Sequence, residues 1–202
     1  GCGKTELCAQ FQRAGYCVLD EAFLDMPDYV LHPQSLLMET SWVVSWFLRL
    51  LKKASEVSAT ADGREPVYIA DRSPFSAVFY AAHGSLLEPI IRHQLEEVAR
   101  HAGILVFTVY LQVERETLWS RIQDRLGREP GRVKYNEDKR EWMEQTLEFY
   151  ETFRWDMTVN NTDISIPALL DEVVCALSAR SDRFRRSVTP ITEAATSSED
   201  DT

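Results

Sequence analysis

The sequence predicts an α/β fold in which helices cover a mostly parallel, open sheet. Short apolar segments at 16–19, 67–70 and 104–111 alternate with longer segments whose apolar residues recur at helical spacing. The segment 104–111 is apolar almost throughout, which is typical of a parallel strand covered on both faces. Residues 1–5 also match the second half of a phosphate-binding loop, which such folds place between a strand and a helix.

The first elements follow directly from local patterns. A helix is expected at 3–14, after the loop motif, and a strand at 16–19 that ends at two acidic residues. A polar, glycine-containing loop precedes the strand at 67–70. The helix expected at 34–53 has a broad apolar face at helical spacing, formed by Leu36, Leu37, Trp42, Val43, Trp46, Phe47, Leu50 and Leu51.

The later elements continue the alternation. Further helices are expected at 75–83, 86–101, 114–125, 138–155 and 167–179, and a short last strand at 157–160. After residue 125 the chain contains two glycines and a proline, which predicts a basic loop. The polar residues near the end predict a disordered acidic tail over 183–202 and a single domain over 1–182.

The composition argues against several functions. The formal net charge of the 202 residues is −10, whereas general nucleic-acid binding requires a basic surface. No apolar run approaches the ~18 residues that a membrane-spanning helix needs. The four cysteines form no C-x-x-C pair and have no histidine at zinc-binding spacing. Reduced thiols in an intracellular protein, cytoplasmic or mitochondrial, are therefore expected.

The phosphate-binding motif is the most specific feature of the sequence. Gly1, Cys2, Gly3, Lys4 and Thr5 match the end of the pattern G-x-x-x-x-G-K-[ST]. In such a loop the backbone N–H groups bind phosphate oxygens, the lysine reaches the β- and γ-phosphates, and the threonine hydroxyl binds Mg²⁺. The predicted cofactors are therefore ATP and Mg²⁺. The alternative is a chance Gly-Lys-Thr before a helix.

The first glycine of this motif and the strand that should precede it do not occur in the sequence. We therefore expect the chain to be a piece of a longer protein, with the first strand of the fold missing. Strands on either side of the gap would have unpaired backbone groups, which are costly when buried. A gapped or distorted sheet is expected as a result.

Two groups of polar residues follow strands and should lie at the carboxyl edge of the sheet, where ligands bind in open α/β folds. In the first group, Asp71 can hold a magnesium-bound water and Arg72 can clamp a phosphoryl oxygen. In the second, Glu21 can take the proton of an attacking hydroxyl as general base. The alternatives are a turn in which Asp71 and Ser73 cap the next helix, and an ordinary exposed acid at Glu21 or a role for its neighbour Asp20.

Arginines are concentrated in one segment of this acidic chain. Arg121 and Arg125 lie one helical turn apart and share a face, whereas Arg128 and Arg132 are expected in the basic loop beyond the helix. Arginines on a mobile lid can close over a transferring phosphoryl group and spread its charge. The alternative is a solvated face that pairs with the nearby acids Glu114, Asp124 and Glu129.

Together these segments resemble the deoxyribonucleoside kinases, within the wider group of P-loop nucleoside and nucleotide kinases. The resemblance runs from residue 1 to about 163 and rests on GCGKT, YCVLDE, DRSPFS, YL and SRIQDRLGRE. It implies the three-layer P-loop NTPase sandwich, with Glu21 as the base for the sugar 5′-hydroxyl. It also implies that Arg72 orients the acceptor and that the lid contains Arg121, Arg125 and Arg128.

The chain departs from this family at three places, one of which is an extra residue in the lid, Leu126 or Gly127. Ala22 follows Glu21, where the family usually has proline. The family often has a Phe-Gln pair on the helix over the base, and the glutamine reads the base edge. The segment found there, 45–47, contains no glutamine. Residues 160–163 are expected near the adenine of ATP, or as a plain turn rich in Asn and Asp.

The resemblance implies a phosphotransferase of nucleotide salvage, which uses ATP to phosphorylate the 5′-hydroxyl of a (deoxy)nucleoside. The expected partner is this small molecule, with no nucleic acid and no membrane, and a homodimer is left open. DRSPFS is also similar to a segment of thymidylate kinases, so a nucleoside monophosphate kinase is an alternative. In that case Arg72 or Arg49 would hold the acceptor's phosphate. A noncatalytic ATP-binding module is the third hypothesis.

Overall fold

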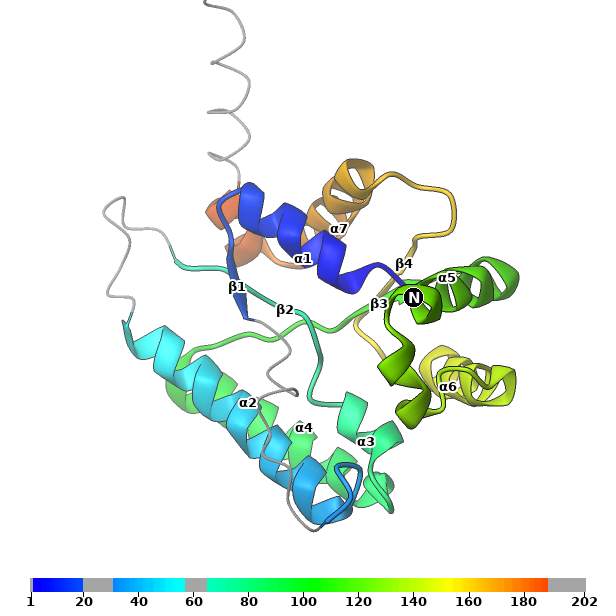
Figure 1. The fold of residues 1–202 in the computed structure, drawn as a ribbon. Helices are drawn as coiled ribbons and strands as arrows, with labels where there is room; N and C mark the ends of the chain where they lie inside the picture. The colour runs from blue at the N-terminus through cyan, green and yellow to red at the C-terminus, as the bar shows by residue number, and fades with distance from the viewer. Residues whose placement is uncertain (1, 20–30, 57–64, 189–202) are drawn as a thin grey trace, which may run out of the picture. The chain divides into compact units, whose positions relative to one another are not determined.

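The computed structural model describes residues 2–19, 31–56 and 65–188 (Figure 1). These residues divide into two compact units. The first unit is formed by residues 1–7 and 107–173, and the second by 8–106 and 174–202, within the described ranges. Each unit contains one pair of parallel strands.

The first unit is built on strands β3 (Val109–Gln112) and β4 (Met157–Asn160), which pair in parallel with Val109 opposite Met157. Its helical elements are the first turn of α1 (Lys4–Arg13), α5 (Arg115–Arg128), the 3₁₀-helix η3 (Pro130–Tyr135), α6 (Arg140–Thr152) and the first half of α7 (Ile166–Arg180).

Strand β3 is shorter than the sequence predicted, because 104–108 are not in a strand. The Asp156 carboxylate accepts hydrogen bonds from the backbone N–H and the hydroxyl of Thr108, each at 2.7 Å. Asp156 therefore satisfies the groups that would otherwise extend the strand pair. On the other side of this segment, the N–H of Ile104 bonds to a carbonyl of the preceding helix, at Val98. Apolar character alone does not reveal these side-chain and helix-end contacts.

Helix α5 is longer than predicted, and this changes the position of one candidate residue. Arg128 was expected in a loop but lies in the last turn of α5, and the segment after it is the 3₁₀-helix η3 instead of an open loop. The N–H of Glu129 still bonds to the carbonyl of Arg125 at 2.8 Å, so the helix continues past Gly127. Pro130, which cannot donate a backbone hydrogen bond, begins the tighter helix.

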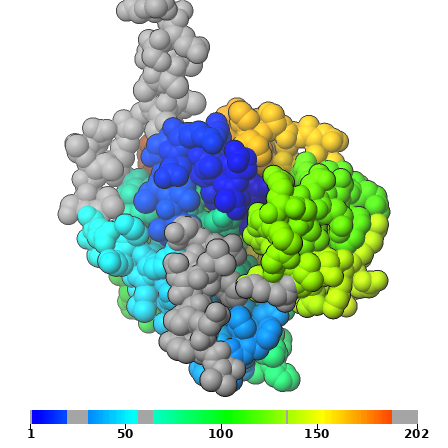
Figure 2. Space-filling view, in the orientation of Figure 1, coloured from blue at the N-terminus to red at the C-terminus, as the bar shows by residue number. Residues whose placement is uncertain are grey.

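Helices α5 and α6 enclose the apolar core of the first unit, and with η3 they form a continuous surface in the space-filling view (Figure 2). The core residues are Val113, Leu118, Ile122, Met143 and Leu147, with Cys2, Trp119 and Leu126 packed against them. Their burial removes apolar surface from water, which is the main source of stability for such a pair of helices.

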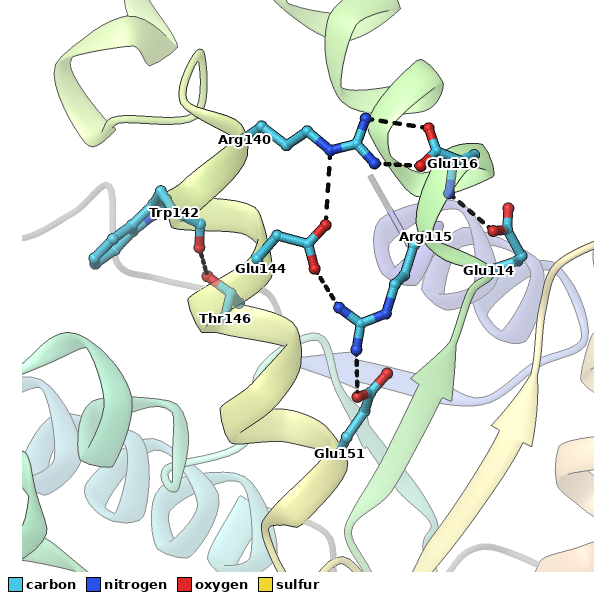
Figure 3. Close-up of polar contacts among 8 residues, drawn as sticks. All are labelled: Glu114, Arg115, Glu116, Arg140, Trp142, Glu144, Thr146 and Glu151. Atoms are coloured by element: carbon cyan, nitrogen blue, oxygen red, sulfur yellow. Dashed lines mark hydrogen bonds and ion pairs between the residues drawn. The ribbon is translucent and has the colours of Figure 1, made fainter.

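Ion pairs join the outer faces of the same two helices (Figure 3). Arg115 of α5 bonds to Glu144 and, at 2.8 Å, to Glu151 of α6. Arg140 of α6 bonds to Glu116 of α5 and lies 3.7 Å from Glu144. These side chains are partly exposed, so each pair contributes little alone, but the network fixes how the helices align.

The second unit contains β1 (Cys17–Leu19) and β2 (Tyr68–Ala70), which pair in parallel with Cys17 opposite Tyr68. Its helical elements are the rest of α1, α2 (Leu36–Glu56), α3 (Ser76–Tyr80), the 3₁₀-helix η2 (Gly84–Leu86), α4 (Leu87–Ala102) and the second half of α7. The chain is also helical over 182–188, where Phe184 and Val188 are buried, so ordered structure extends past residue 182. The remainder of the expected tail, 189–202, lies outside the described residues.

The two strand pairs confirm the prediction of a mixed α/β fold with parallel strands. The described strands form two separate two-stranded sheets, so the prediction of one open sheet is not met within these ranges. No helix in the described part of the chain is both long and apolar enough to cross a membrane.

Candidate functional site

The phosphate-binding motif forms the turn into helix α1, in the first unit. Gly3 has a φ of +81°, and the N–H of Leu7 bonds to its carbonyl at 3.0 Å, which closes the first turn of the helix. Lys4 and Thr5 follow at the helix start, and both are exposed. The first backbone N–H groups of a helix have no partner within it and carry a partial positive charge, so this turn suits an anion.

Asn161, which directly follows β4, holds this turn in place. Its amide Nδ2 donates a hydrogen bond of 2.8 Å to the backbone carbonyl of Cys2, and its side chain is almost fully buried. A Cβ atom on Gly3 would lie 2.9 Å from the same Nδ2, too close for an ordinary contact. Gly3 is therefore required both for its positive φ and for the approach of Asn161.

We expect Gly3→Ala to destabilise the chain more than Gly15→Ala. Gly15 also has a positive φ, of +89°, but a Cβ atom there would meet nothing within 4 Å. Gly15→Ala should therefore cost about 1 kcal/mol of backbone strain, and Gly3→Ala at least about 1 kcal/mol more from the clash with Asn161. Urea unfolding of both variants measures the difference. Equal losses would contradict the role given to Asn161.

Lys4 also affects the cysteine of the motif. Its Nζ lies 3.8 Å from the Cys2 Sγ. Burial acts to raise the pKa of the Cys2 thiol, but the Lys4 ammonium and backbone N–H groups act in the opposite direction, and the pKa lies below its ordinary value. The Lys4 ammonium thus favours the charged form of the sulfur.

Arg121 of α5 fixes the segment after β4. Its guanidinium donates to the carbonyl of Asn161 at 3.1 Å and to that of Thr162 at 2.8 Å. The N–H of Asn161 in turn bonds to the carbonyl of Gln112 at 2.7 Å, which continues the β3–β4 pairing. Arg121 therefore supports Asn161, which holds the turn before α1, and this position is distinct from that expected of a lid arginine.

The other arginines of this segment pair mainly with acids. Arg125 bonds to Glu137 at 2.5 Å, and Arg132 bonds to the other oxygen of Glu137 at 3.1 Å and to Glu129 at 2.5 Å. Arg128 is exposed, and its Nε donates to the backbone carbonyl of Asp124 at 3.3 Å. The ion pair of Arg132 with Glu129 agrees with the alternative of a solvated face that pairs with nearby acids. The ion pairs with Glu137 were not anticipated from the sequence.

In the second unit, Asp71 directly follows β2, as predicted. Its N–H bonds to the carbonyl of Leu19 at 3.0 Å, and its side chain is buried. Ser73 forms a turn before α3: its Oγ accepts from the N–H of Phe75 at 3.3 Å, and its carbonyl accepts from the N–H of Ser76. The N-cap residue of α3 is Phe75, which has no side-chain capping hydrogen bond, so Asp71 and Ser73 do not cap this helix as the alternative expected. Asp71 thus lies at the carboxyl end of a parallel strand, the edge at which ligands bind in open α/β folds.

Arg72 is held among aromatic rings. Its guanidinium carbon lies 4.8 Å from the ring centre of Trp42 and 4.7 Å from that of Tyr80. Its backbone carbonyl accepts a 2.8 Å hydrogen bond from the indole N–H of Trp46. Cation–π contacts on two rings restrict the side chain to few conformations, so its charge has a fixed position.

Comparisons with models of protein families, with curated proteins and with solved structures find no match for this chain. Two of the predicted residues, Gly1 and Glu21, lie outside the described residues.

Asn161 lies in the segment 160–163, which was expected near the adenine of ATP or as a plain turn, and its contact with Cys2 was not anticipated. Sequence reasoning overlooked two residues that matter to these sites. Glu137 acts through contacts between distant segments, for which the sequence carries no local signal. Glu39 is different, because its position does carry one: it lies three, four and seven residues before Trp42, Val43 and Trp46 on the apolar face of α2. A carboxylate at such a position should be buried, and Glu39 is fully buried.

Proposed function

We propose that the chain transfers a phosphoryl group from ATP to the 5′-hydroxyl of a nucleoside. The observation that carries this proposal is the turn of Gly3, Lys4 and Thr5 at the start of α1, on a backbone held by Asn161. Such a turn presents N–H groups to an anion, and Lys4 adds a full positive charge. A triphosphate is the ligand that this set of groups suits best.

The first unit supplies further positive charge. Arg125 and Arg132 share Glu137, whose single charge is smaller than that of a triphosphate. Phosphate oxygens can therefore replace Glu137 as their partner, with Arg128 added from the end of α5. Arg121 acts as a positioning residue, because its donors are used on the backbone of Asn161 and Thr162.

Magnesium fits the donor atoms that the chain offers. Hydroxyl and carboxylate oxygens are the ligands that Mg²⁺ prefers, so Thr5 in the first unit and Asp71 in the second are each, taken by itself, a candidate ligand. Within the described ranges, no group of three or more His, Cys, Asp or Glu side chains is placed to hold a metal. A nucleotide-bound Mg²⁺ takes most of its ligands from phosphates and water, and it neutralises charge on the phosphates.

The second unit supplies groups for the acceptor. Arg72, fixed by Trp42 and Tyr80, would orient the acceptor near its reacting hydroxyl. Glu21 is the residue proposed to take the proton of that hydroxyl. Phosphoryl transfer requires little covalent chemistry from a protein, so positioning and charge are the main contributions of these residues.

The proposal is tested by incubating the full chain with Mg²⁺, ATP labelled in its γ-phosphate, and either thymidine, the other three deoxynucleosides or thymidylate. We expect label on the nucleosides. Glu21→Gln should lower kcat by about 10²- to 10⁴-fold, the usual effect of removing a general base. Asp20→Asn, at the neighbouring position, is the matched control and should change kcat less than about threefold.

The other outcomes separate the alternatives. Transfer to thymidylate but not to thymidine would indicate a nucleoside monophosphate kinase. ATP binding without transfer to any acceptor would indicate a noncatalytic module. Loss of activity in Asp20→Asn but not in Glu21→Gln would assign the base to the neighbouring residue.

A further inference from the structure

Glu137 lies between η3 and α6 and is shared by two arginines that the proposed function assigns to phosphate. One carboxylate oxygen accepts from Arg125 of α5 at 2.5 Å, and the other accepts from Arg132 of η3 at 3.1 Å. The Glu137 side chain is 20% exposed, against 52% for Glu129, the other acid that pairs with Arg132. The charge of Glu137 is therefore less screened by water than that of Glu129.

A tight turn brings Glu137 back to α5. η3 ends at Asn136, which has a φ of +60° and whose N–H bonds to the carbonyl of Val133 at 3.0 Å. Asparagine adopts this left-handed conformation more readily than most residues. The Asn136 side chain accepts a 2.7 Å hydrogen bond from the Nζ of Lys139, which adds a second contact within the turn. The carboxylate of the next residue thus reaches Arg125, twelve residues earlier in the sequence.

The carboxylate does not use all the donors that the two arginines offer. The Nε of Arg125 is buried and has no hydrogen-bond partner among the residues that the structure describes. A guanidinium binds an anion most strongly through two parallel N–H groups, whereas Glu137 offers one oxygen to each arginine. A phosphoryl group has three terminal oxygens and about twice the charge. The arginine pair is therefore better matched to a phosphate than to the carboxylate that it holds.

A counter-charge between these arginines is needed when no ligand is bound, because two guanidinium groups held close together repel each other. Glu137 supplies this charge from the chain itself. Both of its partners are partly exposed, with 29% exposure for Arg125 and 36% for Arg132. Ion pairs at such exposure contribute little, so a multiply charged anion can displace the carboxylate.

We propose that Glu137 is an autoinhibitory counter-anion, which occupies Arg125 and Arg132 in the free chain and must be displaced before a polyphosphate binds them. This inference rests on the triphosphate site proposed above and adds a means by which the chain limits its own affinity for nucleotide. A ligand that binds only those molecules in which Glu137 is displaced has its affinity lowered by their fraction. Removing the carboxylate should therefore tighten the binding of every anion that uses these two arginines.

The inference is tested by titration calorimetry of the full chain with inorganic tripolyphosphate, without Mg²⁺ or nucleoside, so the result does not depend on phosphoryl transfer. Glu137→Gln keeps the size of the side chain and removes its charge. We expect this variant to bind tripolyphosphate about tenfold more tightly than the wild type, the effect that two partly exposed ion pairs can have. In a chain that already contains Arg125→Gln and Arg132→Gln, the same substitution should change the dissociation constant less than about twofold.

Glu144→Gln is the matched control (Figure 3). Glu144 also offers one oxygen to each of two arginines, Arg115 of α5 and Arg140 of α6, and neither of them belongs to the proposed phosphate site. This variant removes the same charge from the same pair of helices, and it should bind tripolyphosphate within about twofold of the wild type. Thermal melting checks the folding of every variant.

A second variant covers the case in which Glu137→Gln melts below the temperature of the titration. Glu137→Asp keeps the charge on a side chain that is one methylene shorter, so the two distances to Arg125 and Arg132 cannot both be kept. We expect it to bind tripolyphosphate more tightly than the wild type, with a smaller gain than the glutamine variant.

Three results would overturn the inference. Glu137 does not compete with phosphate if its variants melt lower but bind tripolyphosphate no more tightly, or if Glu144→Gln gains as much affinity as Glu137→Gln. In both cases, transfer of label from ATP to nucleosides by the wild type would leave the proposed kinase function standing. If neither the wild type nor Glu137→Gln binds tripolyphosphate, the inference and the proposed triphosphate site are both wrong.

Discussion

Replacing Glu39 with glutamine is expected to remove a large part of the pH dependence of stability. The pKa of Glu39 is raised from 4.5 to about 7 in the folded chain, first by burial, with Arg72 acting in the opposite direction. Between these two pKa values the folded state binds a proton that the unfolded state has released. The contribution of Glu39 to stability is therefore fully present below about pH 4.5, falls as the pH rises, and levels off above about pH 7.

The size of this effect follows from the shift in pKa. A difference of about 2.5 units corresponds to about 3 kcal/mol between the two ends of the range. The stability of Glu39→Gln relative to the wild type should thus rise by about 3 kcal/mol from pH 4.5 to pH 8. Urea unfolding of both chains at several pH values measures this directly. Two curves that stay parallel would show that Glu39 titrates normally.

Local patterns predicted the elements of this chain well. The alternation of apolar strands and amphipathic helices indicated the four strands and the helices α1 to α7, because spacing along the sequence reports which face an element buries. It did not indicate η3 or the helix over 182–188. The start of α1 followed from the Gly3-Lys4-Thr5 motif, whose glycine has the positive φ that the turn needs. The end of α5 was harder to predict. Gly127 lowers helix propensity without ending the helix, so Arg128 was misplaced.

The site was less predictable, because its supports connect segments that are distant in the sequence. Asn161 donates a hydrogen bond to the carbonyl of Cys2, which lies 159 residues earlier in the sequence. Arg121 donates to the backbone carbonyls of Asn161 and Thr162. The arginine cluster suggested a lid from composition alone. In the structure, Arg121 bonds to backbone carbonyls, whereas Arg125 and Arg132 share Glu137.

Replacing Lys4 with alanine is expected to lower kcat/KM for phosphoryl transfer by about 10³-fold, or about 4 kcal/mol of transition-state stabilisation. Lys4 is exposed at the start of α1, next to the N–H groups proposed to bind phosphate. Its ammonium would contact the phosphates, whose negative charge increases where the bond to the leaving group breaks. The loss should therefore appear mainly in kcat, and urea unfolding should give the wild-type stability within about 0.5 kcal/mol.

Arg13→Ala is the matched control for Lys4→Ala. Arg13 lies at the opposite end of the same helix, is exposed, and bonds to Gln10 at 2.9 Å. Removing it takes one positive charge from α1 without changing the turn proposed to bind phosphate, so kcat/KM should stay within about threefold. A second readout is the Cys2 thiol, whose pKa should rise in Lys4→Ala and stay unchanged in Arg13→Ala, as measured by the pH dependence of its alkylation. Equal losses of activity in the two variants would show that only the net charge of α1 matters, and the phosphate-binding role of Lys4 would be refuted.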